Sequence, residues 1–296
     1  MLLRLGLEAA DRLANLLPAR VAYALADVAG DAWRRLAPRR RELVAANLRR
    51  VCEASGRPTA GPTFRRLVRD AFRHHARYYL EVLRVPHVPT ARIDEIVDVP
   101  QWPEFARAID GRPSIMVSWH LGNPEPFSTF LASRGIRPLV PIEEIEPRAL
   151  FEFLAARRGA AHPELVPVRR SRRPLTQRLR DGGLVAIIGD RDLDHDGRPV
   201  TVFGHPTTLP TGPAWLAATH RAAILVGRCL REGEGHYRVD GEMIDAGAME
   251  GDRRAMVAEL TERLARRFEA DVAAAPEQWW GAFQPFWPDL ANRDER

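Results

Sequence analysis

The sequence predicts an α/β fold: a mostly buried central sheet flanked by helices, with an N-terminal amphipathic helical cap. From residue 114 onward, short β-rich runs alternate with helical stretches, which is typical of a largely parallel sheet covered by helices. Before residue 92, apolar residues recur at spacings of three and four, which indicates helices. The length of 296 residues suits one domain with a single core.

The N-terminal region, residues 1–92, is predicted to contain four helices, because Pro18 and Pro38 separate amphipathic stretches near 2–17, 19–37 and 39–54, and a further one spans about 63–83. In the first helix Leu5, Ala9 and Leu13 mark an apolar face. That face either packs on the core or lies in a bilayer interface, and the sequence leaves both open.

The second region, residues 93–296, contains the predicted sheet. Its β-rich runs are 114–118, 137–141, 165–168, 184–189, 199–203, 223–228 and 236–240. Helical stretches lie near 125–133, 147–158, 174–181, 213–220 and 252–272. The chain contains no internal repeat and no low-complexity linker, so we expect one domain overall, with residues 1–92 packed on the α/β core.

Charge divides the chain unevenly. Residues 1–92 contain 18 arginines and eight acidic residues, a net charge of +10, so the remainder carries about −5 of the total of +5. A basic N-terminal third favours an anionic partner, either nucleic acid or the anionic leaflet of a membrane. No helix-turn-helix, zinc-finger or RNA-binding aromatic motif is present, so we expect no nucleic-acid partner.

Residue usage excludes several chemistries. The chain contains no lysine, which excludes Schiff-base catalysis and a Walker-type phosphate site. Its two cysteines, Cys52 and Cys229, make a disulfide framework improbable and favour a reducing cytoplasmic setting. No apolar run reaches the length of a transmembrane helix, and charges interrupt any signal-peptide core. We expect no bound metal, since the acidic residues near 190–196 lack the spacing of a calcium loop.

The sharpest local feature is the segment SWHLGNPE, residues 118–125, between a predicted strand and a predicted helix. His120 is placed at the carboxyl end of the strand, the usual location of active-site groups in open α/β sheets. Asn123 is a favourable N-cap, Pro124 suits the first helical position, and Glu125 falls in the first turn, where the helix dipole favours a carboxylate. A carboxylate near a histidine fixes its tautomer and stabilises its protonated form.

His120-x4-Glu125 resembles the H-x4-D/E motif of the lysophospholipid acyltransferase superfamily. The longer string HLGN-x-E is similar to the branch that contains lipid A lauroyl acyltransferases and actinobacterial phosphatidylinositol mannoside acyltransferases, closest to the latter. Further segments resemble that branch in the same order along nearly the whole chain: NLRRV at 47–51, GDRDL at 189–193, VFG at 202–204, TGPA at 211–214 and PEQW at 276–279.

This resemblance implies an enzyme that moves a fatty acyl group from acyl-CoA, or from acyl carrier protein, to a hydroxyl of a membrane glycolipid. It implies no cofactor, acyl-CoA being a co-substrate, and a peripheral location on the cytoplasmic face of the cell membrane. It gives His120 the role of base and Glu125 that of its charged partner, with Asp190 as a supporting acid. Residues 93–296 are then the acyltransferase core.

The resemblance also implies substrate-binding residues, which are Glu143, Arg158, Arg191 and Asn123. Glu144 and Arg157 are adjacent to two of these, and a one-residue shift in alignment exchanges them. The branch usually has an aromatic residue where this chain has Pro124, so the acyl or acceptor preference is expected to differ. A lysophospholipid or lipid A-type acceptor is the alternative within the class, and a non-enzymatic basic membrane- or nucleic-acid-binding protein is the alternative outside it.

Overall fold

A seven-stranded sheet in the order β1-β9-β8-β2-β5-β3-β4 forms the centre of the computed structural model, which describes residues 2–160 and 163–293. Residues 1, 161–162 and 294–296, which fall within the two expected regions, lie outside this description. The strands of the sheet are β1 (Val97–Asp98), β2 (Ser114–Ser118), β3 (Leu139–Ile142), β4 (Glu164–Pro167), β5 (Leu184–Ile188), β8 (Ala223–Gly233) and β9 (His236–Asp245). The predicted α/β class is confirmed.

Strand β2 lies at the centre of the sheet and pairs in parallel with both β5 and β8. Its apolar residues Ile115, Met116 and Val117 are buried, as expected for a strand covered on both faces. In the register of β2 and β5, Ser118 lies opposite Ile188. Because β2, β5 and β3 run in parallel, their carboxyl ends share one edge of the sheet.

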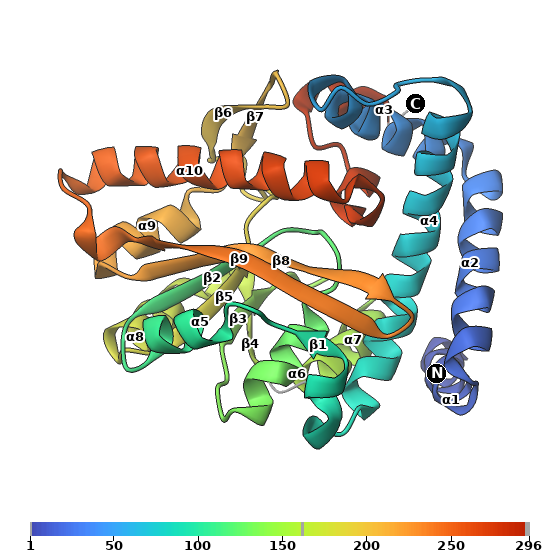
Figure 1. The fold of residues 1–296 in the computed structure, drawn as a ribbon, viewed down its shortest axis with the longest axis horizontal. Coiled ribbons are helices and arrows are strands. Elements are labelled where there is room, and N and C mark those ends of the chain that lie inside the picture. Colours follow the sequence, from blue (N-terminus) through green and yellow to red (C-terminus); the bar gives the residue numbers. More distant parts are fainter. Residues whose placement is uncertain (1, 161–162, 294–296) are drawn as a thin grey trace.

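Helices cover both faces of this sheet (Figure 1). On one face lie α8 (Arg172–Arg180), α9 (Gly212–His220) and α10 (Arg253–Ala274), and on the other lie α5 (Trp102–Ile109) and α6 (Glu125–Ser133). A separate hairpin of β6 (Arg198–Val202) and β7 (His205–Leu209) packs against α10. Helix α7 (Arg148–Ala160) connects β3 to β4.

The N-terminal region forms α1 (Leu2–Leu16), α2 (Ala19–Leu36), α3 (Pro38–Ala54) and α4 (Gly61–Arg84), so the four predicted helices are present. Helices α2 and α4 stand side by side at one end of the sheet (Figure 1). Two bidentate ion pairs join them, Arg73 with Asp31 and Arg77 with Asp27. Among the described residues, no helix has both the length and the apolarity needed to cross a bilayer.

Several elements differ from the sequence expectation. Strands β8 and β9 form an antiparallel pair and extend beyond their predicted ends, where polar residues obscure the strand pattern. Helix α5 and strands β1 and β7 were not predicted. The turn of the β6–β7 hairpin is formed by Phe203 and Gly204, both at positive φ, whereas residues 194–196 form an exposed loop before β6.

Candidate active site

The chain turns sharply where β2 ends, and this turn places His120 at the carboxyl edge of the sheet. Gly122 has a φ of +64°, and a Cβ atom there would lie 2.0 Å from the carbonyl oxygen of Cys229. Only glycine permits this close approach. The Gly122 N–H donates to the carbonyl of Gln278, and the next N–H, that of Asn123, donates to the carbonyl of Cys229. The turn is therefore fixed against β8 and the C-terminal segment.

Asp190 is the carboxylate that contacts His120. The two atoms His120 Nδ1 and Asp190 Oδ1 are 2.6 Å apart, and the His120 backbone N–H also donates to the same carboxylate at 3.1 and 3.2 Å. The Asp190 side chain is 1% exposed and that of His120 is 15% exposed. A hydrogen bond from Nδ1–H to the carboxylate leaves Nε2 with a lone pair that can accept a proton.

Glu125 forms a second buried ion pair beside the first. Its Oε1 accepts from Arg158 Nε at 2.9 Å, and the same guanidinium donates to the hydroxyl of Tyr78 at 2.7 Å. Asp190 is thus the carboxylate in contact with the His120 ring, and the expected role of Glu125 as charged partner of His120 stays a prediction. The first turn of α6 directs the Glu125 carboxylate toward α7, where Arg158 neutralises it.

Arg158 and its neighbour Arg157 contact different acidic residues. Arg157 points away to α1, where it forms an ion pair with Asp11 at 2.7 Å, and Arg158 alone reaches Glu125. Burial raises the pKa of Tyr78 to about 12, so its phenol stays neutral at physiological pH beside the Glu125–Arg158 pair.

Trp280, which no sequence motif marked as a site residue, contacts both His120 and Tyr78. Its ring meets the His120 ring edge-on at a centroid distance of 4.4 Å and stacks on Tyr78 at 4.7 Å. His75 lies nearby, in contact with Trp280. Burial, and next the charge of His120, lower the pKa of His75 to about 3, so it stays neutral while His120 can take a proton.

The remaining predicted residues occupy two places. Arg191, next to Asp190, donates to Glu143 at 2.9 Å, and both side chains are partly exposed at the carboxyl edge of β5 and β3. Asn123 is fully buried: its Nδ2 donates to Glu81 and its Oδ1 accepts from the Glu125 N–H. The N-cap position of α6 is occupied by Pro124, one residue later than expected, although Asn123 still accepts the N–H of the first helical residue, Glu125. The substrate contact of Asn123 stays a prediction. No three His, Cys, Asp or Glu side chains of the described chain gather as metal ligands.

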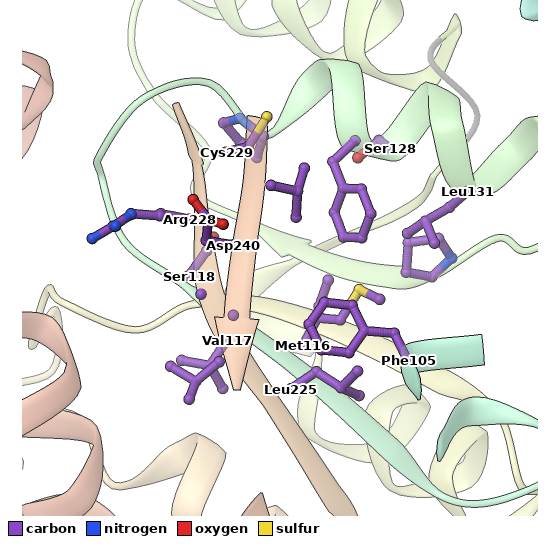
Figure 2. Close-up of a pocket in the computed structure, with 18 of the residues that line it drawn as sticks. Phe105, Met116, Val117, Ser118, Ser128, Leu131, Leu225, Arg228, Cys229 and Asp240 are labelled. Atoms are coloured by element: carbon purple, nitrogen blue, oxygen red, sulfur yellow. The ribbon is translucent and has the colours of Figure 1, made fainter. Parts of the chain in front are cut away.

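An apolar pocket lies beside residues 119–124, the turn between β2 and α6, which is called the motif turn below. Leu121 and Pro124 line it, so it starts at the residues that flank Asn123. The pocket is partly open to solvent and lies between the sheet and helices α5 and α6. The deeper wall is built mainly from apolar side chains, among them Phe105, Met116, Phe127, Leu131, Leu225 and Val239. Figure 2 shows Phe105, Met116 and Leu225 close together, while the Arg228 side chain extends away from them.

His120, held by the buried Asp190, therefore lies at the carboxyl edge of the sheet, and the turn that carries it also supplies Leu121 and Pro124 to the apolar pocket. The chain belongs to the bacterial lipid A biosynthesis acyltransferases, whose family profile matches residues 7–287. It is an acyltransferase of the branch that also contains the phosphatidylinositol mannoside acyltransferases.

Two relatives carry the latter name. The chain is 32% identical to the phosphatidylinositol mannoside acyltransferase of Mycolicibacterium smegmatis over 238 residues, which is 78% of this chain and 75% of that protein. It is also 32% identical to the Mycobacterium tuberculosis protein of the same name over 229 residues, 75% of this chain and 69% of that protein.

Asp190→Asn tests the carboxylate that contacts His120. The amide has nearly the same shape but cannot stabilise a protonated imidazole, so we expect acyl transfer to fall by about 10²- to 10⁴-fold with little change in melting temperature. Turnover of an acyl thioester measures the loss. Asp194→Asn, in the exposed loop four residues away, is the matched control and should keep wild-type turnover. Equal turnover of the two variants would remove Asp190 from the mechanism.

Proposed function

We propose that this protein is a membrane-peripheral O-acyltransferase that transfers a fatty acyl group from acyl-CoA to a hydroxyl of a glycolipid, a phosphatidylinositol mannoside. The observation that carries the proposal is the His120–Asp190 pair beside an apolar pocket, in a chain related to two proteins with that acceptor in their names. The proposed donor, the proposed acceptor and the proposed membrane association are each supported by different described residues.

The chemistry follows from the free nitrogen of His120. Nε2 takes the proton of the acceptor hydroxyl as its oxygen attacks the thioester carbonyl carbon, and the Asp190 carboxylate stabilises the imidazolium that forms. The tetrahedral intermediate then collapses, the carbon–sulfur bond breaks, and the imidazolium returns the proton to the departing thiolate. The products are an O-acyl ester and a free thiol, so no redox partner is required.

The apolar pocket suits the acyl chain of the donor. A fatty acyl chain gains about 0.8 kcal/mol for each methylene removed from water, so an apolar cavity beside the reacting carbonyl contributes directly to binding. Pro124 lines this pocket rather than the polar side of the site. The smaller residue at this position therefore affects the choice of acyl chain more than the choice of acceptor.

Polar residues along the same edge suit a sugar-bearing acceptor. Glu143 and Arg191 are partly exposed and pair with each other, so each has further hydrogen-bonding capacity toward hydroxyl and phosphate groups. Arg158 is 31% exposed beside Glu125. A mannosylated, phosphate-containing headgroup presents both kinds of group.

The N-terminal helices suit a membrane surface because α1 packs through Asp11, Ala14 and Asn15 and leaves most of its leucines outside. Asp11 is buried against Arg157, and Asn15 bonds the backbone of α4. The apolar face predicted from the sequence points to solvent instead, with Leu5 55%, Leu13 56% and Leu16 81% exposed. This orientation favours the second of the two alternatives that the sequence left open, a helix that lies in a bilayer interface.

Helix α2 continues the same apolar surface. Val21, Leu25 and Val28 recur at helical spacing along its outer side and are 44%, 51% and 65% exposed. Eight of the twelve large hydrophobic side chains that are exposed in the described chain lie on these two helices. Exposed arginines accompany them on α1 and α2, namely Arg4, Arg12, Arg20 and Arg35. A surface of this kind is complementary to an anionic leaflet.

His120→Ala tests the activity itself. Without the imidazole no group takes the acceptor proton, so we expect release of CoA thiol from palmitoyl-CoA to fall at least about 10³-fold while the melting temperature stays within a few degrees. The measurement uses purified protein with phosphatidylinositol mannoside in mixed micelles. His205→Ala, on the β6–β7 hairpin, is the control histidine.

The acceptor and the donor form the other arms of this assay. Lysophosphatidylinositol and a lipid A precursor replace the mannoside, and acylated carrier protein replaces palmitoyl-CoA. Faster turnover with either replacement acceptor would transfer the assignment to that lipid class. Full turnover by His120→Ala with every acceptor would reject the proposed mechanism.

Leu13→Glu combined with Leu16→Glu tests the membrane surface. Burying each leucine in a bilayer contributes about 1.5–3 kcal/mol, so the double variant should bind phosphatidylglycerol vesicles at least about 10-fold more weakly. Its melting temperature should not change, because both side chains are exposed. Co-sedimentation with vesicles measures binding, and Met243→Glu on β9 is the matched exposed control. Wild-type binding by the double variant, or a wild-type dimer that the substitutions dissociate, would contradict a membrane role for this surface.

A further inference from the structure

A buried carboxylate on α4, that of Glu81, contacts the motif turn through the side chain of Asn123. Glu81 is 1% exposed in the interior of α4, before the helix ends at Arg84. Its carboxylate accepts from the Tyr23 hydroxyl at 2.8 Å, from Asn123 Nδ2 at 2.9 Å, and from both Nε and Nη2 of Arg231. It therefore joins α2, α4, β8 and the turn that follows β2.

The contact with Asn123 determines which way the Asn123 amide faces. Because Nδ2 donates to Glu81, Oδ1 is left to accept the backbone N–H of Glu125 at 3.0 Å. That bond begins α6, and it places Glu125 where Arg158 reaches it. A rotated amide would present its NH₂ group to the Glu125 N–H and lose the cap.

Arg231, another partner of Glu81, is also held in place by hydrogen bonds. Arg231 is also buried, and its peptide group exchanges two hydrogen bonds with the side chain of Gln278, at 3.0 and 2.9 Å. The carbonyl of Gln278 in turn accepts the Gly122 N–H. Glu81 and Arg231 thus support the motif turn at two points, Asn123 and Gly122.

We propose that Glu81 is a positioning residue of the transfer reaction. Through Asn123 it fixes the start of α6, and with it the Glu125–Arg158 pair beside His120. This inference rests on the proposed function and adds a residue, outside the HLGNPE motif, on which the geometry of the motif depends. Asn123 then acts through the helix start, and its amide is not free to bind substrate.

The charges around Glu81 permit a direct test. Burial lowers the pKa of His74, which contacts Arg231, to about 3, so this histidine is neutral and the interior holds one guanidinium and one carboxylate. Exchanging the amide and the carboxylate between positions 81 and 123 preserves that balance. Aspartate is also as good an N-cap as asparagine, so the Glu125 N–H keeps its acceptor.

The experiment compares Asn123→Asp with the double variant Asn123→Asp/Glu81→Gln. In the single variant two carboxylates oppose each other, and we expect kcat with palmitoyl-CoA to fall by about 100-fold while KM changes little, because the reacting groups are displaced. In the double variant the new amide at position 81 donates to the new carboxylate at position 123. Its NH₂ group then replaces the oxygen that also accepts from Arg231 Nη2, so kcat should recover to within about 10-fold of wild type rather than completely. Tyr23→Phe, which removes a Glu81 partner but leaves the Asn123 contact, should stay within about 3-fold.

Hydrogen exchange gives a readout that does not depend on activity. The peptide covering residues 121–130 should exchange faster in Asn123→Asp and regain protection in the double variant. A single variant with wild-type kcat and exchange, or a double variant that is unfolded or no better than the single, overturns the inference. A wild-type protein that turns over no acyl thioester overturns the proposed function instead, whatever the variants show.

Discussion

The hydrogen bond between His120 and Asp190 is the contact on which the rest of the site depends. Each residue lies two positions beyond the end of its strand, and the parallel register that pairs Ser118 with Ile188 brings both to the same point of the sheet edge. A buried carboxylate is costly unless it is hydrogen-bonded, and here it accepts from both the ring and the backbone of His120. The topology of the sheet thus brings the imidazole and its carboxylate together, and Gly281 of the C-terminal segment bonds the His120 carbonyl.

The other residues in contact with the imidazole and its turn come from elements far away in the sequence. Trp280, from the C-terminal segment, contacts both His120 and Tyr78, and Tyr78 in turn accepts from Arg158. The turn itself is held by β8 and the C-terminal segment through backbone hydrogen bonds. Helix α4 contributes Glu81, whose carboxylate accepts from the side chain of Asn123. The N-terminal helices therefore do more than cover the core: one side of them supports the reaction site while the other presents apolar side chains to solvent.

The sequence predicted those features that arise locally. Strand β2 and the helix after the motif follow from short-range rules, and both are present; Asn123 bonds the first helical residue, although the helix begins one residue later than expected. Contacts between distant residues left no local signal, so Glu81, Arg231 and Trp280 were not assigned, and Glu125 was paired with His120 instead of Arg158. The direction of the α1 apolar face was likewise undetermined, since periodicity defines a face but not its partner.

Lipid analysis of living cells tests the central claim most directly. Cells that lack this chain are complemented with the wild-type or the His120→Ala protein, and their phosphatidylinositol mannosides are compared by mass spectrometry. If His120 supports acyl transfer to that lipid, a species with one fewer acyl chain should accumulate in the deletion and persist with His120→Ala, and the wild-type protein should remove it. An unchanged mannoside profile in the deletion, or full complementation by His120→Ala, would contradict the account.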